Sequence, residues 1–320
     1  MIRPTFEAVS ELNARLERIG NLKADGRPIL GLDSKELLRM VLAVEPRGLY
    51  VPAHIWTPWF AIFGSKSGFD SMEEAFEELA GEVRAIETGL SSDPSMNWRV
   101  ADLDGRAVIS NSDAHSPQKL GREATVVTSE ASYEAVMGAI KTNDERLVGT
   151  IEFFPEEGKY HYDGHRACGV RLAPAETKAR GGLCPKCGKP LVVGVDYRVG
   201  ELAPADRPEG YEPAGHKRVE YIIPMIEVLA ELAGVKSTSG RAVAEEYDRL
   251  VRKLGSEFAI LHSVPVERIR EVSRGLAEAV ARMRRREVYL EPGYDGVFGV
   301  VRVFRDAAER VQTMDQLSLL

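Results

Sequence analysis

Four residues that bind soft metals fall within one short stretch of the sequence. His165 and Cys168 form an H-x-x-C pair, and after fifteen residues Cys184 and Cys187 form a C-P-K-C-G turn. Two such pairs supply the four ligands of a tetrahedral structural zinc site, which leaves no open position for chemistry. A disulfide or idle thiols are the alternatives, and a reducing cytosol argues against the disulfide. We expect a structural Zn²⁺ on these four residues, with His161 as a competing fourth ligand.

A second group of chemically capable residues follows an apolar run in "AVISNSDAHSPQKLGRE", residues 107–123. Asp113 and His115 stand two positions apart, and alternate residues of a strand face the same way. Parallel α/β folds build their sites at the carboxyl ends of strands. A carboxylate and an imidazole that meet there suit a divalent metal ion. The alternative is a helix-capping Asp beside an incidental His.

Two further polar residues lie at comparable positions. His54 follows the apolar segment 48–53, and Glu87 lies near the end of the segment 83–88. Together with Asp113 and His115 they resemble the catalytic rim of a β/α barrel. We therefore expect these four residues to be catalytic, with His54, Asp113 and His115 as ligands of Zn²⁺, Mg²⁺ or Mn²⁺. The alternative for His54 is a histidine satisfied in the core.

Periodicity indicates the elements that position these residues. Helical spacing is expected over 5–19, 34–44, 70–80, 131–142, 218–234, 240–255 and 267–287, and short strands over 48–53, 83–88, 106–111 and 147–153. Alternation of strands and helices favours an α/β class with parallel strands. Glycines punctuate a hairpin-like tail at 293–304. We expect an α/β region over 1–154, a zinc-binding module over 155–200 and a mostly helical domain over 201–320.

One segment of the chain is basic, although the whole chain of 320 residues has a formal net charge of -7. Residues 158–192 hold seven Lys or Arg and two acids, a local charge of 7 − 2 = +5. Such a cluster on a rigid module suits DNA phosphates, although a solvated loop is the alternative. The candidates for DNA binding within it are Lys159, Arg166, Lys178, Arg180, Lys186 and Lys189. "RMRRRE" at 282–287 is a second basic candidate, which the helix dipole also explains.

Other side chains near the predicted rim could contact a nucleotide. Arg122 could clamp a phosphate or pair with Glu123 or another acid. Trp56 and Trp59, with Phe60 and Phe63 beside them, could stack on a base, although aromatic residues at this spacing often form core. No apolar run reaches the length of a membrane span, and the start lacks the build of a signal peptide, so we expect a cytoplasmic protein.

Several long motifs now carry a family resemblance. "VPAHIWTPWFAIFG", "LSSDPSMNW", "SNSDAHSPQKLGRE", "PEEGKYHYDGH", "CPKCGKPLVVGV" and "YRVGELA" resemble, in the same order, segments of the endonuclease Q family. The resemblance implies a polymerase-and-histidinol-phosphatase (PHP) barrel, a zinc-binding module and a helical domain. His54, Asp113 and His115 match the family's metal motifs, and His165, Cys168, Cys184 and Cys187 match its zinc module.

The resemblance also implies a function. It indicates a metal-dependent DNA repair endonuclease that cuts on the 5′ side of uracil, hypoxanthine, xanthine or an abasic site. The family's barrel opens with a His-x-His strand, which this sequence lacks. We therefore expect a partial barrel whose missing ligands lie upstream of Met1, and a chain that alone is weak or inactive. A non-catalytic zinc-dependent DNA-binding protein and a PHP-type phosphoesterase on small phosphates are the alternative functions.

Overall fold

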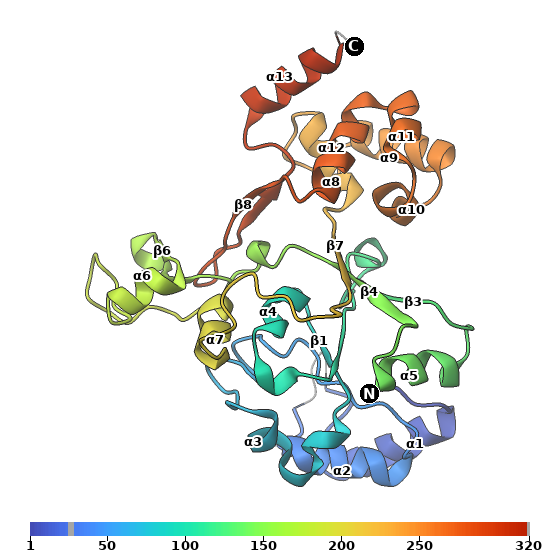
Figure 1. Ribbon diagram of the computed structural model, residues 1–320, viewed down its shortest axis with the longest axis vertical. Coiled ribbons are helices and arrows are strands. Elements are labelled where there is room, and N and C mark those ends of the chain that lie inside the picture. Colours follow the sequence, from blue (N-terminus) through green and yellow to red (C-terminus); the bar gives the residue numbers. More distant parts are fainter. Residues whose placement is uncertain (25–28, 319–320) are drawn as a thin grey trace. The chain divides into compact units, whose positions relative to one another are not determined.

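The computed structural model describes residues 1–24 and 29–318, whose contacts divide the chain into two compact units (Figure 1). The first unit consists of Met1–Ser110, Thr125–Gly149 and Arg198–Arg218. The second unit consists of Asn111–Ala124, Thr150–Tyr197 and Val219–Leu320. Each unit is therefore assembled from segments that are distant in the sequence. The three-part division expected above remains a prediction.

Helices and a short parallel sheet make up the first unit. Its helices are α1 (Phe6–Leu16), α2 (Ser34–Val44), α3 (Met72–Phe76), α4 (Pro94–Trp98) and α5 (Tyr133–Thr142), with 3-10 turns η1 (Glu77–Glu82) and η2 (Ala101–Leu103). Side-chain caps define three of these starts, since Thr5, Asp33 and Ser132 accept backbone amides of the first turn. The helices predicted over 5–19, 34–44 and 131–142 are confirmed. The one predicted over 70–80 is split between α3 and η1.

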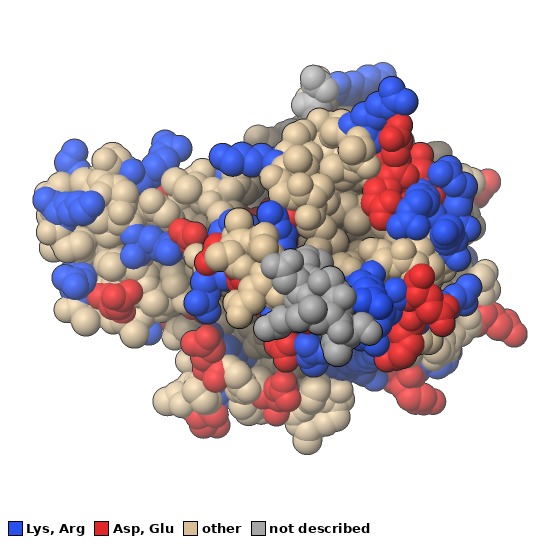
Figure 2. All heavy atoms as spheres, turned by 90° about the horizontal axis from the view of Figure 1, so that it is seen from above, with Lys and Arg blue, Asp and Glu red and all other residues tan. Residues whose placement is uncertain are grey.

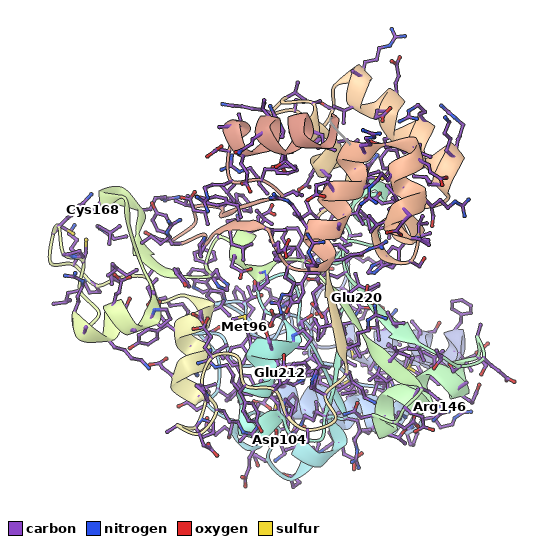
Figure 3. The ribbon with its side chains drawn as sticks, turned by 45° about the horizontal axis from the view of Figure 1, so that its top comes forward. Met96, Asp104, Arg146, Cys168, Glu212 and Glu220 are labelled. Atoms are coloured by element: carbon purple, nitrogen blue, oxygen red, sulfur yellow. The ribbon has the colours of Figure 1, made fainter. Side chains whose placement is uncertain are left out.

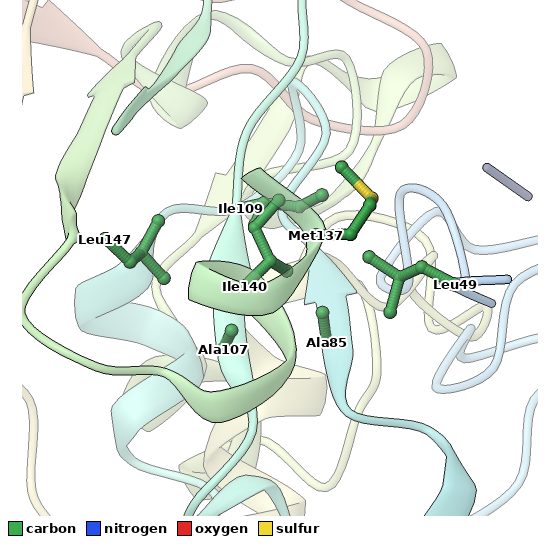
Figure 4. Packing of buried hydrophobic residues seen from close by; sticks show 7 residues of the cluster. All are labelled: Leu49, Ala85, Ala107, Ile109, Met137, Ile140 and Leu147. Atoms are coloured by element: carbon green, nitrogen blue, oxygen red, sulfur yellow. The ribbon is translucent and has the colours of Figure 1, made fainter. Parts of the chain in front are cut away.

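Strands β1 (Ala85–Glu87) and β2 (Ala107–Ile109) pair in parallel, with Ala85 opposite Ala107. The cluster on this pair consists of Leu49, Ala85, Ala107, Ile109, Met137, Ile140 and Leu147 (Figure 4). Small alanines on both strands leave room for Met137 and Ile140 of α5 to pack against them. This packing fixes the strand that carries Glu87 and the strand that leads toward Asp113.

Two of the strand predictions are confirmed by β1 and β2, and the one over 147–153 by β4 (Leu147–Glu152). The strand expected over 48–53 is wrong, because only Leu49 forms a bridge, to Ile2. Pro52 has no amide to donate, and the chain turns at His54, whose φ is +38°. Strand β4 lies between β3 (Ala124–Val127) and β7 (Arg218–Tyr221) in a three-stranded sheet.

The second unit contains two antiparallel hairpins and a group of helices. Strands β5 (Asp163–His165) and β6 (Val170–Leu172) form one pair, and β8 (Tyr289–Glu291) and β9 (Val300–Arg302) form the other. The helices are α6 (Pro174–Ala179), α8 (Met225–Leu232), α9 (Arg241–Leu254), α10 (Glu257–His262), α11 (Val266–Val272), α12 (Arg274–Arg284) and α13 (Ala307–Ser318). The 3-10 turns are η3 (Pro117–Lys119), η4 (Pro155–Glu157) and η5 (Arg166–Cys168), and α7 (Val195–Leu202) runs across the unit boundary.

The helical predictions for this part need two corrections. The stretch 218–234 begins as strand β7 and turns helical only after Pro224, which caps α8. The stretch 267–287 is divided at Ser273, whose hydroxyl caps α12. The helix over 240–255 is confirmed as α9. The tail is a hairpin, but its first strand, β8, lies before the predicted range of 293–304, which holds only the tip and β9.

Candidate functional site

The structure brings the four soft ligands of the second unit together. One ligand atom each from His165, Cys168, Cys184 and Cys187 lies within 4.8 Å of the other three, and Figure 3 labels Cys168 at this cluster. His165 Nδ1 is 3.5 Å from Cys187 Sγ. Two knuckles separated by a short helix therefore converge as a tetrahedral zinc site requires.

Local backbone conformation sets up both knuckles. The first follows β5, and Gly169 (φ +59°) lets the chain return directly as β6. In the second, the amide of Gly188 donates to the Cys184 carbonyl, and the amide of Cys184 donates to Lys189. Leu183 and Pro190 form a bridge that closes this loop. The cysteines thus lie on two tight turns, which is the arrangement of zinc knuckles.

The thiols differ in acidity. Burial opposes ionisation of Cys184, but the backbone amides of Lys186 and Cys187 donate to its sulfur, and the balance lowers the pKa of Cys184 to about 6. Hydrogen bonding with Cys187, together with burial, raises the pKa of Cys168 to about 11. A thiol whose pKa lies below its ordinary value, beside three further soft ligands, fits a metal that binds thiolates. The cluster could therefore hold a metal ion.

In the first unit, His54 and Glu87 lie in direct contact. The backbone amide of His54 donates a 2.6 Å hydrogen bond to Glu87 Oε2, and Glu87 is 7% exposed. His54 Nδ1 is buried and has no hydrogen-bond partner among the described residues. Gly89 makes this packing possible, because a Cβ there would lie 2.5 Å from the Cβ of His54. A buried imidazole nitrogen without a partner fits the metal ligand that the sequence predicts.

In the second unit, Asp113 and His115 lie on an exposed turn. Asp113 has φ +44°, and its carbonyl lies 2.8 Å from His115 Nδ1. That contact favours the tautomer with Nδ1 protonated, which leaves Nε2 as the ligand atom. Arg122 supports the turn from inside, since its Nε donates to the Ser112 carbonyl at 2.8 Å. His54 belongs to the other unit, so a common metal site remains a prediction.

The aromatic candidates after His54 have different surroundings. Trp56 is 1% exposed, and its indole N–H donates to Asn97 Oδ1 at 2.8 Å, while Phe63 is fully buried against it. Both rings are core, and base stacking by Trp56 is therefore corrected to a packing role. Trp59 and Phe60 are 41% and 80% exposed and keep open ring surface.

The basic residues of the zinc module are exposed. Figure 2 shows Lys and Arg side chains over the part at its left, where β6 and α6 lie in Figure 1. Lys178 lies over the Tyr197 ring, Lys186 donates to the Cys168 carbonyl, and Lys159 lies over the Phe298 ring. Exposed cations fixed on a small rigid module suit phosphate contacts.

The second basic stretch, 282–287, is engaged within the protein. Arg282 bonds with Glu278 and Glu309, and Arg284 donates to three backbone carbonyls. Arg286 lies 4.0 Å from the centroid of the Tyr221 ring. These contacts give the stretch a structural role at the end of α12.

Two solved structures are similar to this chain. PfuEndoQ from Pyrococcus furiosus, a lesion-specific endonuclease, matches with TM-score 0.83 and 27% identity over 97% of this chain and 77% of that chain. Endonuclease Q in complex with a 27-mer duplex that has an abasic lesion at the active site matches with TM-score 0.80 and 28% identity, over 94% and 75% of the two chains. The resemblance to the endonuclease Q family is confirmed. The expected fold class, α/β of PHP type with C-terminal helices, is confirmed with it, and the His/Cys cluster could hold a zinc ion.

Sequence comparison agrees with this resemblance. Residues 96–144 match the "PHP-associated" family model, and residues 224–287 match the "MJ0043 C-terminal domain" model. The uncharacterized protein MJ0043 of Methanocaldococcus jannaschii is 28% identical over 275 residues, 81% of this chain and 33% of that protein. The uncharacterized protein YqxK of Bacillus subtilis is 31% identical over 259 residues, which are 80% of this chain and 61% of that protein. The chain thus spans about a third and about three fifths of these two relatives. In the described residues, no helix is both long and apolar enough to span a membrane.

Proposed function

We propose that this chain acts in DNA repair as a metal-dependent endonuclease that cuts the phosphodiester on the 5′ side of a damaged nucleotide. The observation that carries the proposal is the match over 97% of the chain to a lesion-specific endonuclease. The substrates proposed are duplexes with an abasic site or a deaminated base, namely uracil, hypoxanthine or xanthine. Such nucleotides are the cheapest to extrude from a stack, at a cost of about a few kcal/mol.

The proposed catalytic metal ligands are His54, Asp113 and His115, with Glu87 as a supporting carboxylate. Support comes from the buried, unpartnered Nδ1 of His54 and from the free Nε2 that the Asp113–His115 contact favours. A divalent ion (Zn²⁺, Mg²⁺ or Mn²⁺) would activate water and offset charge on the phosphate. Glu87 fixes the His54 backbone through its 2.6 Å hydrogen bond, and so positions the ring.

The zinc module is proposed to bind the duplex next to the lesion. Its net +5 over 158–192 contrasts with a chain of net charge -7. Lys159, Arg166, Lys178, Arg180, Lys186 and Lys189 are the proposed phosphate contacts, and Arg122 the proposed contact beside the Asp113 turn. Such contacts give affinity without sequence preference, as a lesion-searching enzyme requires.

The test is a nicking assay with a labelled duplex that contains one abasic site, uracil or hypoxanthine. We expect this chain alone to nick weakly or not at all, because of the ligands that the family resemblance implies are missing; any nicks should fall at the 5′ side of the lesion, require Mg²⁺, Mn²⁺ or Zn²⁺, and be lost in His54→Ala. Lys236→Ala is a control for an exposed cation outside the proposed contacts. A gel shift without cleavage that His54→Ala leaves unchanged would favour the non-catalytic DNA-binding function instead. Hydrolysis of a free phosphomonoester but not of DNA would favour the small-phosphate enzyme.

A further inference from the structure

The tip of the β8–β9 hairpin, residues 293–299, packs against the segment that leads into the zinc module. The amide of Tyr162 donates to the Gly293 carbonyl at 2.9 Å, and the amide of Gly296 donates to the Lys159 carbonyl at 3.0 Å. Asp295 Oδ2 accepts the amide of Arg166 at 2.5 Å. All these residues belong to the second unit, so the hairpin tip and the module share one surface.

Glycines make this close seating possible. A Cβ on Gly164 would lie 2.3 Å from the Tyr294 ring, and a Cβ on Gly299 would lie 2.1 Å from the Glu156 carbonyl. Both distances are far below van der Waals contact, so side chains at these positions would push the tip away. Gly164 of the module and Gly299 of the tip therefore both permit the docked position of the tip.

The docked tip exposes one aromatic ring among cations. Phe298 is 66% exposed, although an apolar side chain of this size gains about 1.5–3 kcal/mol from full burial. Lys159 Nζ lies 4.9 Å from the centroid of its ring. A guanidinium nitrogen of Arg166 lies 3.3 Å from the position that a Cβ on Gly296 would occupy. An exposed ring with one cation at its face, and a second cation near Gly296 two residues before it, is an arrangement that can bind a base by stacking and its phosphate by charge.

We propose that Phe298 stacks on an unstacked nucleobase of damaged DNA while Lys159 contacts the adjacent phosphate. This inference rests on the proposed function and names a residue that determines how that function recognises its substrate. An abasic site leaves the opposite base without a pairing partner, which lowers the free-energy cost of unstacking that base. The local +5 charge favours an anionic occupant over an apolar protein surface, and the exposed Phe298 ring beside it favours DNA, which offers a base to stack, over an acidic protein surface.

The test measures binding without cleavage. Fluorescence anisotropy compares a duplex with one abasic site and the matched intact duplex, for the wild-type chain, Phe298→Ala, Phe298→Trp and Lys159→Gln. Phe298→Ala should weaken binding of the abasic duplex about tenfold and leave the salt dependence unchanged, because stacking releases no counterions. Phe298→Trp should retain the affinity. Lys159→Gln should lower the slope of log K against log salt by about 0.9, the value for one phosphate contact.

Phe6→Ala is the matched control, since Phe6 is 87% exposed and lies in the first unit. A 2-aminopurine opposite the abasic site gives an independent readout, because stacking quenches its fluorescence. Equal affinity and equal quenching for wild type and Phe298→Ala would overturn the inference while leaving the proposed DNA binding intact. Absence of any DNA binding by the wild-type chain would overturn both.

Discussion

The backbone amide of Arg166 donates a 2.5 Å hydrogen bond to Oδ2 of Asp295, a residue 129 positions later in the chain. Arg166 directly follows His165, the first residue of the soft-ligand cluster. The hairpin tip thereby fixes the backbone of the first knuckle from outside the module. Loss of a group that orients a metal ligand from outside commonly weakens metal binding by about 10- to 100-fold.

We expect Asp295→Ala to weaken Zn²⁺ binding roughly tenfold, because the first knuckle loses its support. Competition with a chromophoric chelator measures this affinity directly. Asp295→Asn keeps an acceptor oxygen at a position with φ +42°, which Asn tolerates, and should recover most of the loss. Asp206→Ala, an exposed acid of the first unit, is the control. Equal zinc affinity in Asp295→Ala and the control would contradict the coupling.

Removal of the metal should release the hairpin tip. We expect a chelator, or Cys184→Ser, to increase hydrogen exchange at the amides of Tyr162, Arg166 and Gly296, which bond across this contact. Cys184 is 2% exposed and packs with Val170, Leu172 and Leu191, so loss of its metal bond loosens the small core of the module. Exchange in α2 should not change. Unchanged exchange at the three amides after complete zinc removal would argue against this prediction.

Gly89 is predicted to control the position of His54. Gly89 and Gly105 both have positive φ (+60° and +79°), but a Cβ at Gly89 would meet His54 whereas a Cβ at Gly105 would meet nothing within 4 Å. Gly105→Ala should lower the free energy of unfolding by only the cost of placing a residue with a Cβ at positive φ, about 1–2 kcal/mol. Gly89→Ala should cost roughly 1–3 kcal/mol more from the clash, and should also displace His54. Urea unfolding measures the free energy of unfolding of both variants, and the difference between them gives the cost of the clash with His54. Equal losses of stability in the two variants would contradict the prediction.

Local features of the sequence predicted much of this arrangement, while contacts between distant residues did not follow from it. The C-x-x-C and H-x-x-C spacings fix ligands within a few residues of one another, so pattern alone indicated the cluster. Trp56 differs, because its burial depends on Asn97, which lies 41 residues away and accepts the indole N–H. The packing of the Tyr294 ring against Gly164 likewise depends on two segments that only folding brings together. The glycines spaced along 293–299 indicated a tight turn in the backbone, but they did not indicate which segment the tip packs against.

Glu157 should make stability depend on pH. Burial, together with the negative charge of Glu227, raises the pKa of Glu157 from 4.5 to about 7, although Lys119 and Arg122 oppose the shift. The folded state therefore binds more protons than the unfolded state between about pH 4.5 and 7, so the free energy of unfolding falls as pH rises through this window. At pH 8 the buried carboxylate is charged and destabilises the fold by on the order of 2 kcal/mol, after allowance for partial exposure.

Glu157→Gln removes that charge. We expect the variant to be more stable than wild type at pH 8 by on the order of 2 kcal/mol, and nearly equal to it at pH 5, where Glu157 is protonated in the folded state. Urea unfolding at the two pH values measures the difference, with exposed Glu209→Gln as the control. A difference between Glu157→Gln and wild type that is the same at pH 5 and pH 8 would show that Glu157 does not titrate in this window. The expected sign is specific to a buried acid, because a carboxylate stabilised by an ion pair would lose stability on acidification instead.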